Sequence, residues 1–373
     1  MNLSLVSTLF EENFVHYGEL GASLSIWQDG RELLSLAHGF ADREKTIPWT
    51  TRTPVLFWSA TKGPSAACLL HVCESNGIPL TSKVARFWPE FAAGGKEAVT
   101  LADLLSHQAG LAGLSSDISV FEYDQLIDAL ARETPHWPLG SGHGYHPRTF
   151  GFLLDELVRR MTGGTTLGSY WREVFAQPLG LDLSIGLDPV RVEEVAPIFA
   201  PRSAPPKGDV FYTAFLTPGS FTARAFASPK GLHNASSMNT AMARTASFPA
   251  FGGIGTASSL AKFYAMLARG GSMDGRVFFT PQTLALMTTT LTQGEDRVLQ
   301  MENAFSAGFM RDPVDAGHRK LRRTFGPSLT AFADPENRIA FAYVMNQMEP
   351  GVLPNPKSIR LVEALYTAGR ESV

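Results

Sequence analysis

Strand-like sequence occurs at the two ends of the chain, whereas the middle is dominated by helical patterns. Near the N-terminus, residues 21–39 hold two β-type runs on either side of Asp29-Gly30, a dipeptide that favours a tight hairpin turn. Near the C-terminus, residues 328–333 and 338–345 predict two more strands. Because strands must pair, the simplest arrangement is one sheet built from both ends of the chain, with a helical domain inserted between them.

The length of 373 residues exceeds that of one small domain, and 44% hydrophobic residues suffice for a large core. We expect an α/β (α+β) protein with a discontinuous sheet domain, residues 1–65 and 290–373, and a mainly helical domain, residues 66–289. A last helix is predicted over 356–369. Residues 195–235 are rich in Pro, Gly, Ser and aromatic residues, and predict a long ordered loop because the aromatic side chains favour burial.

Helical patterns in the middle of the chain predict helices over 60–76, 100–107 and 148–162. Cys68 and Cys73 fall in the first of these, five residues apart and therefore on different faces. A disulfide between them is not expected, and no second pair of Cys or His completes a zinc site. We expect neither a metal nor a cofactor.

The charge pattern excludes several kinds of partner. The net charge is −3, without a long run of like charges, so neither nucleic acid nor an anionic membrane is an expected partner. No stretch approaches the about 20 apolar residues of a membrane-spanning helix. No Lys or Arg precedes the apolar N-terminal run, and Glu11 and Glu12 interrupt it, so we expect a first helix rather than a signal peptide, and a cytoplasmic location. No sequence feature indicates an oligomeric state.

The segment Phe57-Trp58-Ser59-Ala60-Thr61-Lys62-Gly63 is the sharpest chemical signal. A serine hydroxyl is a weak nucleophile until a base takes its proton. A lysine three positions later on a helix lies on the same face, and if it is desolvated its pKa falls far enough for it to act as that base. Spacing alone leaves open that Ser59 is a helix cap and Lys62 a solvated neighbour.

A second match to the same spacing, Ser259 to Lys262, shows that the motif is weak by itself. The first match has the more suggestive context, because it follows strand-like residues, opens a helix and is surrounded by apolar and aromatic side chains. No Gly-x-Ser-x-Gly occurs, which disfavours an ordinary α/β-hydrolase, and no His-Glu-x-x-His occurs, which disfavours a zinc hydrolase.

Several motifs in a fixed order resemble the serine β-lactamase / penicillin-binding-protein-like family, and within it the class C-like carboxylesterases called family VIII. They are FWSATKG at Ser59, LADLLSHQAGL, Tyr145-His146-Pro147 before a helix, QPLGLDLSIGL, FPAFGGIGTASSLAKFYAMLARGG and FADPENRIAFAYVMNQM. The similarity covers nearly the whole chain. It implies a β-lactamase-like fold: an antiparallel sheet flanked by helices, an inserted mainly helical domain, and an active site between the two.

The resemblance also implies roles for three residues. Ser59 is the nucleophile that forms an acyl-enzyme, Lys62 accepts its proton, and Tyr145 moves protons between serine, lysine and the leaving group. The asparagine of the family's Tyr-x-Asn motif is Pro147 here. This change removes an amide donor for a substrate amide and therefore favours ester substrates. His107 matches a structural turn below the site.

The third family motif, on the strand facing the serine, departs from the pattern. Neither Lys-Thr-Gly nor His-x-Gly occurs in the segment Arg322-Arg323-Thr324-Phe325-Gly326-Pro327-Ser328-Leu329-Thr330. That strand normally gives one N–H to the oxyanion hole, the other coming from the nucleophile. Losing one donor costs about 10²–10³ in rate, and Pro327 has no N–H to give. We expect the oxyanion hole to consist of the N–H of Ser59 and a second N–H donor from Gly326 or Ser328.

The expected substrate is a small ester or amide, contacted by Trp58, His146 and Arg323. Arg322 and Arg323 are suited to bind a substrate carboxylate. It is equally consistent with the sequence that they are two solvated arginines at the start of a strand. The leading function is a carboxylesterase for short acyl esters with weak β-lactam hydrolysis. The alternatives are an acyltransferase or amidase/β-lactamase of the same fold, and a catalytically silent binding protein with a degenerate third motif.

Overall fold

The computed structural model describes residues 2–311, 325–328, 330–351 and 355–370. The α-helices of this part are α1 (Ser4–His16), α2 (Lys62–Ser75), α3 (Leu101–Leu105), α4 (Tyr123–Arg132), α5 (Thr149–Thr162), α6 (Leu167–Trp171), α7 (Gln177–Leu179), α8 (Val210–Leu216), α9 (Phe221–Ala227), α10 (Ala235–Met238), α11 (Ala241–Thr245), α12 (Ala257–Ala268), α13 (Pro281–Thr288) and α14 (Pro356–Arg370). Shorter helical turns are η1 (Trp58–Thr61), η2 (Val84–Arg86), η3 (Pro89–Gly95), η4 (Arg172–Ala176) and η5 (Pro189–Glu194).

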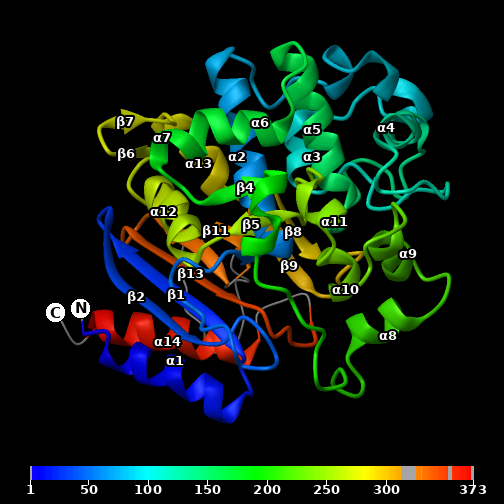
Figure 1. Cartoon of the computed structure of the whole chain (residues 1–373). Helices are drawn as coiled ribbons and strands as arrows, with labels where there is room; N and C mark the ends of the chain where they lie inside the picture. Colours follow the sequence, from blue (N-terminus) through cyan, green and yellow to red (C-terminus); the bar gives the residue numbers. More distant parts are fainter. Residues whose placement is uncertain (1, 312–324, 329, 352–354, 371–373) are drawn as a thin grey trace.

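The strands of the described part form one large sheet and two small ones. They are β1 (Gly21–Gln28), β2 (Arg31–Gly39), β3 (Val55–Leu56), β4 (Leu183–Ile185), β5 (Gly253–Gly255), β6 (Ser272–Met273), β7 (Arg276–Val277), β8 (Thr292–Glu295), β9 (Glu302–Phe305), β10 (Met310–Arg311), β11 (Phe325–Ser328), β12 (Ala331–Asp334) and β13 (Ile339–Met345). The large sheet has the order β2-β1-β13-β12-β11-β10-β9-β8 (Figure 1). Because β1 pairs antiparallel with β13, the expected sheet built from both ends of the chain is confirmed.

The hairpin expected near the N-terminus is present as β1 and β2, joined through Asp29 (φ 50°) and Gly30 (φ 79°). Positive φ at both central residues is the turn geometry that matches the twist of the flanking strands. The C-terminal prediction needs a correction, because the strand expected over 328–333 is two strands. β11 ends at Ser328 and β12 begins at Ala331, and these two residues pair with each other.

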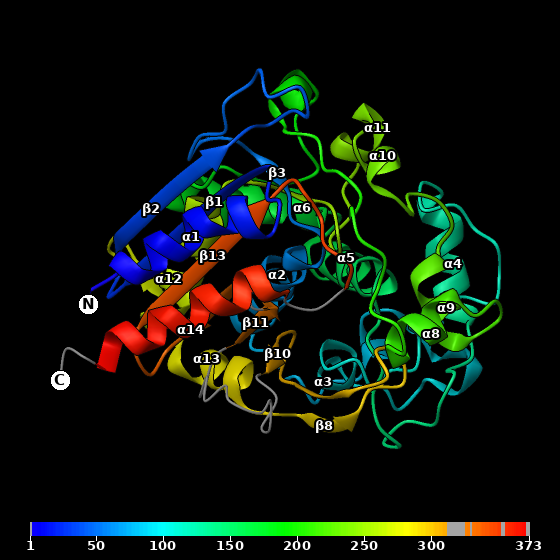
Figure 2. The same ribbon diagram turned by 90° about the horizontal axis from the view of Figure 1, so that it is seen from below.

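The two faces of the large sheet carry different side chains. Phe341 and Tyr343 of β13 pack in one core with residues of α1 and α14, which lie side by side below the sheet (Figure 2). Ala340 and Ala342, which point to the opposite face, belong to the core that contains α12. Alternation along a strand produces this division, and the small alanine side chains let α12 lie close to β13. Helix α12 thus packs on the sheet although it falls within residues 66–289.

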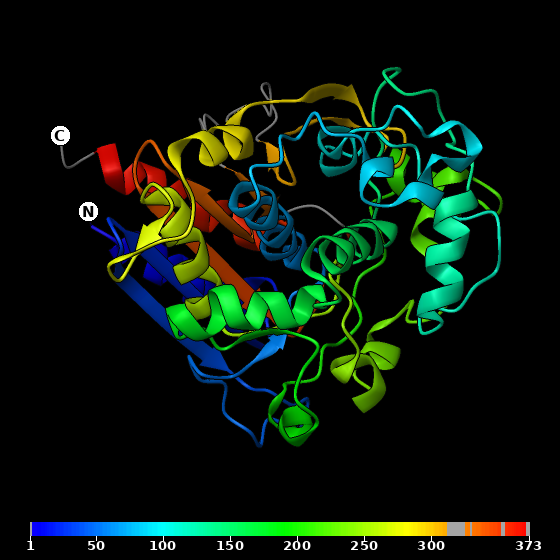
Figure 3. The same cartoon turned by 90° about the horizontal axis from the view of Figure 1, so that it is seen from above.

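Helix α2 runs through the middle of the molecule and packs against α5 and α6 (Figure 3). Most of its residues are buried, so α2 holds the Ser59 turn at its N-terminus in a fixed place. Thr100 and Asp103, which suit an N-cap and the third helical position in the sequence, cap α3: Thr100 Oγ1 accepts from Asp103 N while an Asp103 oxygen accepts from Thr100 N. Helix α5 ends at Gly163, which has the left-handed conformation typical of helix ends.

Residues 195–235 are not purely a loop, because they contain α8 and α9. Three of their aromatic rings contact one another with centroids 5.5–5.7 Å apart: Phe211 and Phe215 are stacked, and Phe226 meets both of them edge to face. These side chains are half-buried rather than fully buried. Their mutual contacts give the segment a small core of its own, which explains why helices form there.

Two further expectations concern this part of the chain. Cys68 and Cys73 are buried free thiols, so the expected absence of a disulfide between them is confirmed. Among the helices of the described residues, none combines the length and the apolar character needed to cross a membrane.

Candidate active site

The turn η1, which carries Ser59, is held by strand β5. Phe57 N donates to Gly253 O at 2.8 Å, and Gly253 N donates to Thr61 Oγ1 at 2.8 Å. A Cβ on Gly253 would lie 2.7 Å from that same Thr61 oxygen, so only glycine permits this approach. Trp58 has φ 49°, which is rare for a bulky residue, and it places Ser59 at the start of the helical segment that continues into α2.

Lys62 lies one turn after Ser59, with its ammonium group inside the protein. Its Nζ is 3.3 Å from Ser59 Oγ and donates to Pro147 O at 2.7 Å and Ala250 O at 2.9 Å. The side chain is only 3% exposed. Burial, together with the positive charge of Arg148, holds the pKa of Lys62 well below its ordinary value. Such an amine becomes able to accept a proton at a lower pH than an ordinary lysine.

Tyr145 is brought to the same place from the loop before α5. Its hydroxyl is hydrogen-bonded to the Ser59 side chain, and Lys62 Nζ lies 4.6 Å from the centre of its ring. Burial raises the pKa of Tyr145, so the hydroxyl stays protonated and able to donate at neutral pH. The structure therefore brings together all three side chains that the sequence singled out.

A buried carboxylate, Asp296, fixes the backbone at Tyr145. Its oxygens accept from Tyr145 N at 3.1 Å, from Val298 N and Leu299 N at 2.8 Å, and from Asn303 Nδ2 at 3.1 Å. Sequence reasoning missed this residue, because nothing near position 296 signals a contact with the loop about Tyr145. The pairing exists only in the folded chain.

A cavity of about 330 Å³ opens beside Ser59. Its lining is mostly apolar, with three polar side chains, and the described residues that line it are Trp58, Ser59, Pro147, Arg148, Phe215, Ala223, Phe226, Ala227, Leu232, His233 and Phe251. Its size and lining are typical of a small-molecule site. Helices α8 and α9 supply part of the wall, so the segment expected as a loop borders this cavity. Arg148 is a further residue that the sequence did not single out.

The histidines near Tyr145 have structural surroundings. His146 Nε2 accepts from Leu111 N at 2.7 Å, and His146 Nδ1 lies 2.8 Å from Gly144 O. Burial lowers the pKa of His146 to about 3, which fits a neutral ring that donates through Nδ1. His146 is not among the described residues that line the cavity, so the expected substrate contact is not supported. His107 and His143 are likewise buried.

The other expected contacts have mixed outcomes. Trp58 lines the cavity next to Ser59. Strand β11, with Gly326 and Ser328, lies against η1 and α2, so the backbone that carries the third motif faces the nucleophile turn. Arg322 and Arg323 lie outside the described residues.

No metal site is apparent in residues 2–311, 325–328, 330–351 and 355–370, where no three side chains of His, Cys, Asp or Glu gather closely enough to hold an ion. The chemistry of the Ser59 group is that of nucleophile, amine and phenol, which needs no metal ligand.

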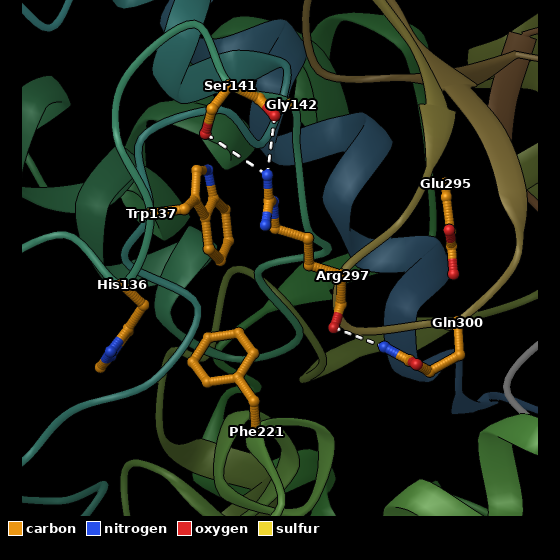
Figure 4. Close-up of a pocket in the computed structure, with 8 residues that line it drawn as sticks. All are labelled: His136, Trp137, Ser141, Gly142, Phe221, Glu295, Arg297 and Gln300. Atoms are coloured by element: carbon orange, nitrogen blue, oxygen red, sulfur yellow. Dashed lines mark hydrogen bonds between the residues drawn. The ribbon is translucent and has the colours of Figure 1, made fainter.

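A second pocket, of about 530 Å³, lies on another side of α9 and is shown in Figure 4. Its Arg297 Nη2 donates to Ser141 O at 2.7 Å, and the rings of Trp137 and Phe221 form part of its wall. Although this pocket is larger than the cavity beside Ser59, its described lining lacks a serine with a lysine next to it. We therefore place the candidate active site at Ser59.

Comparison with known proteins identifies the family of the chain. The family model described as Beta-lactamase matches residues 7–365. The chain belongs to the beta-lactamase family. This family membership places it among the serine hydrolases and confirms both the resemblance found in the sequence and the expected fold class.

Three similar proteins illustrate the relationship. Esterase/beta-lactamase LipL of Mycobacterium tuberculosis is 31% identical over 348 residues, which are 88% of this chain and 77% of LipL. A crystal structure of a penicillin-binding protein homolog from Caulobacter crescentus is 36% identical with a TM-score of 0.87, covering 98% of this chain and 97% of that one. A family VIII carboxylesterase structure is 31% identical with a TM-score of 0.86 and the same coverage.

Proposed function

We propose that this beta-lactamase family member is a carboxylesterase that hydrolyses short acyl esters through an acyl-enzyme on Ser59. The observation that carries the proposal is the grouping of Ser59 Oγ with Lys62 Nζ, at 3.3 Å, and with the Tyr145 hydroxyl, at a mostly apolar cavity. The site would lie between a sheet portion, residues 1–65 and 290–373, and a helical portion, residues 66–289.

The proposed reaction has two halves. Ser59 Oγ attacks the ester carbonyl carbon while its proton passes to Lys62 Nζ. The tetrahedral intermediate collapses, and the leaving alcohol takes a proton through the Tyr145 hydroxyl. Water then attacks the acyl-serine while one of its protons passes to Lys62 Nζ. When this second tetrahedral intermediate collapses, Ser59 Oγ takes a proton back from Lys62 and the acid leaves. The lowered pKa of Lys62 supports the first step, because an ammonium cannot accept a proton.

The oxyanion of both intermediates needs hydrogen-bond donors. We assign the N–H of Ser59 as one donor and an N–H of β11, at Gly326 or Ser328, as the other. The packing of β11 against η1 supports the assignment. Since Pro327 cannot donate, the second donor must come from one of its neighbours.

Three observations favour esters over amides and β-lactams. The position of the motif asparagine is occupied by Pro147, whose carbonyl oxygen accepts from Lys62 Nζ, so no side-chain amide is available to hold a substrate amide. The family VIII structure is a carboxylesterase. The cavity of about 330 Å³, bordered by the aromatic side chains Phe215 and Phe226, suits a short acyl group. The name esterase/beta-lactamase of LipL supports weak β-lactam hydrolysis as a secondary activity.

The decisive experiment is detection of a covalent adduct on Ser59. Intact-mass spectrometry after a fluorophosphonate should show one added label that maps to Ser59 and is absent from Ser59→Ala. A folded protein that forms no adduct would instead be a binding protein without catalysis. Nitrocefin turnover equal to or above that of p-nitrophenyl butyrate would contradict the ester preference, and transfer of the acyl group to an added alcohol in place of water would favour the acyltransferase alternative.

A further inference from the structure

Arg148 is a buried cation at the cavity beside Ser59, and no carboxylate among the described residues balances its charge. Its side chain lines the cavity, is 6% exposed, and lies 4.9 Å from the centre of the Phe251 ring, which also lines the cavity. Within the described part of the chain, no Asp or Glu oxygen lies within the 4.0 Å of an ion pair with it. Buried charges are normally paired, because removal from water is costly.

The hydrogen bonds of Arg148 do not replace a counter-charge. Nη2 donates to Gly231 O, and Nη1 lies 3.4 Å from Phe226 O and 2.9 Å from His233 Nδ1. The Nε–H has no acceptor in the described structure. The His233 ring is also a shared acceptor, because Gly231 N points to its other nitrogen at 3.0 Å. A neutral imidazole accepts at one nitrogen only, so one of the two donors is left unsatisfied.

The charge persists at neutral pH. Burial lowers the pKa of Arg148 to about 10, which leaves the guanidinium protonated at pH 7. Burial lowers the pKa of Lys62, the lysine beside Ser59, and so favours its neutral form. The cavity therefore presents a positive charge to whatever enters it, within walls that are otherwise mostly apolar and that strengthen electrostatic attraction.

Resting on the esterase function proposed above, we propose that the natural substrates are esters carrying a carboxylate in the half that occupies this cavity, and that Arg148 binds that carboxylate. A guanidinium is the side chain best suited to a carboxylate, with which it forms charge-assisted hydrogen bonds. Apolar walls would hold the chain that separates the carboxylate from the ester group. The sequence suggested Arg322 and Arg323 for such a contact, whereas the structure points to Arg148.

The competing explanation is that Arg148 only ties the segment around Gly231 and His233 to α5 and lowers the pKa of Lys62. Both explanations predict that Arg148→Gln is a poorer enzyme. They differ in substrate selectivity, because a purely structural arginine affects charged and neutral esters alike. The readout is therefore a ratio of two kcat/KM values, from which general damage to folding or to Lys62 cancels.

The test uses two pairs of esters that differ only in methylation of a remote carboxylate. One pair, para-(butyryloxy)benzoate and its methyl ester, carries the charge on the alcohol half, and the other, p-nitrophenyl hydrogen adipate and p-nitrophenyl methyl adipate, carries it on the acyl half. After division by the rates of uncatalysed hydrolysis, the unaltered protein should favour the charged member of at least one pair by about tenfold to a hundredfold in kcat/KM. Arg148→Gln should lose this preference, and Arg148→Lys should keep part of it.

Arg297→Gln is the matched control, because it removes an equal charge from the separate pocket of Figure 4. It should leave the selectivity ratio unchanged. No preference for either charged ester by the unaltered protein would overturn the proposal, and so would an Arg148→Gln variant that keeps the preference. If Arg148→Gln does not fold, the two ester pairs can still be compared on the unaltered protein, and equal kcat/KM values for the charged and methylated members would overturn the proposal.

Binding measured without turnover distinguishes failure of the proposed esterase function from failure of the proposed anion site. Ser59→Ala should bind the charged member of the preferred pair about tenfold or more tightly than its methyl ester by isothermal titration calorimetry, and Ser59→Ala with Arg148→Gln should not. If the unaltered protein hydrolyses none of the esters but this binding difference is present, the anion site stands and the esterase proposal falls. Equal binding of both members of each pair would overturn the anion site.

Discussion

Two segments of the chain have the same Ser-x-x-Lys spacing but lie in different surroundings. At Ser59, the lysine is 3% exposed and its ammonium meets Ser59 Oγ and two backbone carbonyls. At Ser259, Lys262 Nζ donates to Leu179 O at 2.8 Å and forms an ion pair with Asp274 at 2.8 Å. Its side chain is 23% exposed. The ammonium of Lys262 meets a carboxylate and solvent, whereas burial lowers the pKa of Lys62, which pairs with no described carboxylate, and makes Lys62 the better candidate base.

The two serines differ as well. Ser259 Oγ accepts from Asp182 N at 2.8 Å and from Thr256 Oγ1 at 3.0 Å, so it is part of the cap of α12 and of the link to the β4 region. Ser59 Oγ faces a cavity and is shared by Lys62 and Tyr145. A helical spacing thus places serine and lysine together, but the rest of the fold decides whether they can do chemistry. The following experiments test that distinction.

Replacement of the two serines should give the largest difference. Ser59→Ala should lower kcat/KM for p-nitrophenyl butyrate by at least about 10⁴-fold, because Ser59 is the only Ser, Thr or Cys among the described residues that line the cavity. Ser259→Ala should retain the activity and lower the free energy of unfolding by about 1–2 kcal/mol, because a buried N–H loses its acceptor. Steady-state kinetics with p-nitrophenyl butyrate measures the activity of both variants, and urea titration measures their free energy of unfolding. An active Ser59→Ala variant would show that Ser59 is not the nucleophile.

Replacement of the two lysines should give the next largest difference. Lys62→Met keeps most of the packing but removes the base, and should cost about 10²–10⁴ in kcat/KM. Lys262→Met loses a partly exposed ion pair and the hydrogen bond to Leu179 O, so its free energy of unfolding should fall by about 1–2 kcal/mol with activity retained. Steady-state kinetics and thermal unfolding of both variants check this. Equal loss of activity in Lys62→Met and Lys262→Met would contradict the inference that the surroundings of Lys62 make it the catalytic base.

Tyr145 has no counterpart in the Ser259 segment. Tyr145→Phe removes only the hydroxyl, and should lower kcat/KM by about 10²-fold because proton transfer to the leaving alcohol suffers. The effect should shrink for esters of acidic alcohols, which leave without a proton. Comparison of p-nitrophenyl butyrate with ethyl butyrate measures it; the same loss for both esters would contradict a role in protonating the leaving group.

The pH dependence should show the smallest but most specific effect. Lys62 accepts a proton only when neutral, so kcat/KM should rise with pH through the pKa of Lys62, at a pH well below the about 10.4 of an ordinary lysine. Arg148→Gln removes a nearby positive charge, which raises the pKa of Lys62 and shifts the rise to higher pH. Lys262→Met should leave the rise where it is. A rise that stays fixed in Arg148→Gln would show that this charge does not act on the base.

Local patterns in the sequence predicted much of the fold correctly. The turn at Asp29 and Gly30, the cap of α3 and the end of α5 at Gly163 each depend on residues within one or two turns of each other. The incorrect predictions concern segments whose structure depends on pairing or packing with other segments. The strand expected over 328–333 is divided between β11 and β12, and residues 195–235 form α8 and α9, because contacts among side chains of that segment stabilise helices.

The resemblance of the ordered motifs to a known family was enough to single out Ser59, Lys62 and Tyr145. Spacing alone suggested only Ser59 and Lys62, and left open that they are a helix cap and a solvated neighbour. The tertiary structure alone decided their surroundings. Lys62 donates to carbonyls 85 and 188 residues away, and Asp296 holds a backbone N–H 151 residues away. The burial of Lys62 and Arg148, and the lack of a partner carboxylate for them in the described part of the chain, result from such distant contacts. They depend on which segments meet in space, and the sequence around each residue does not contain that information.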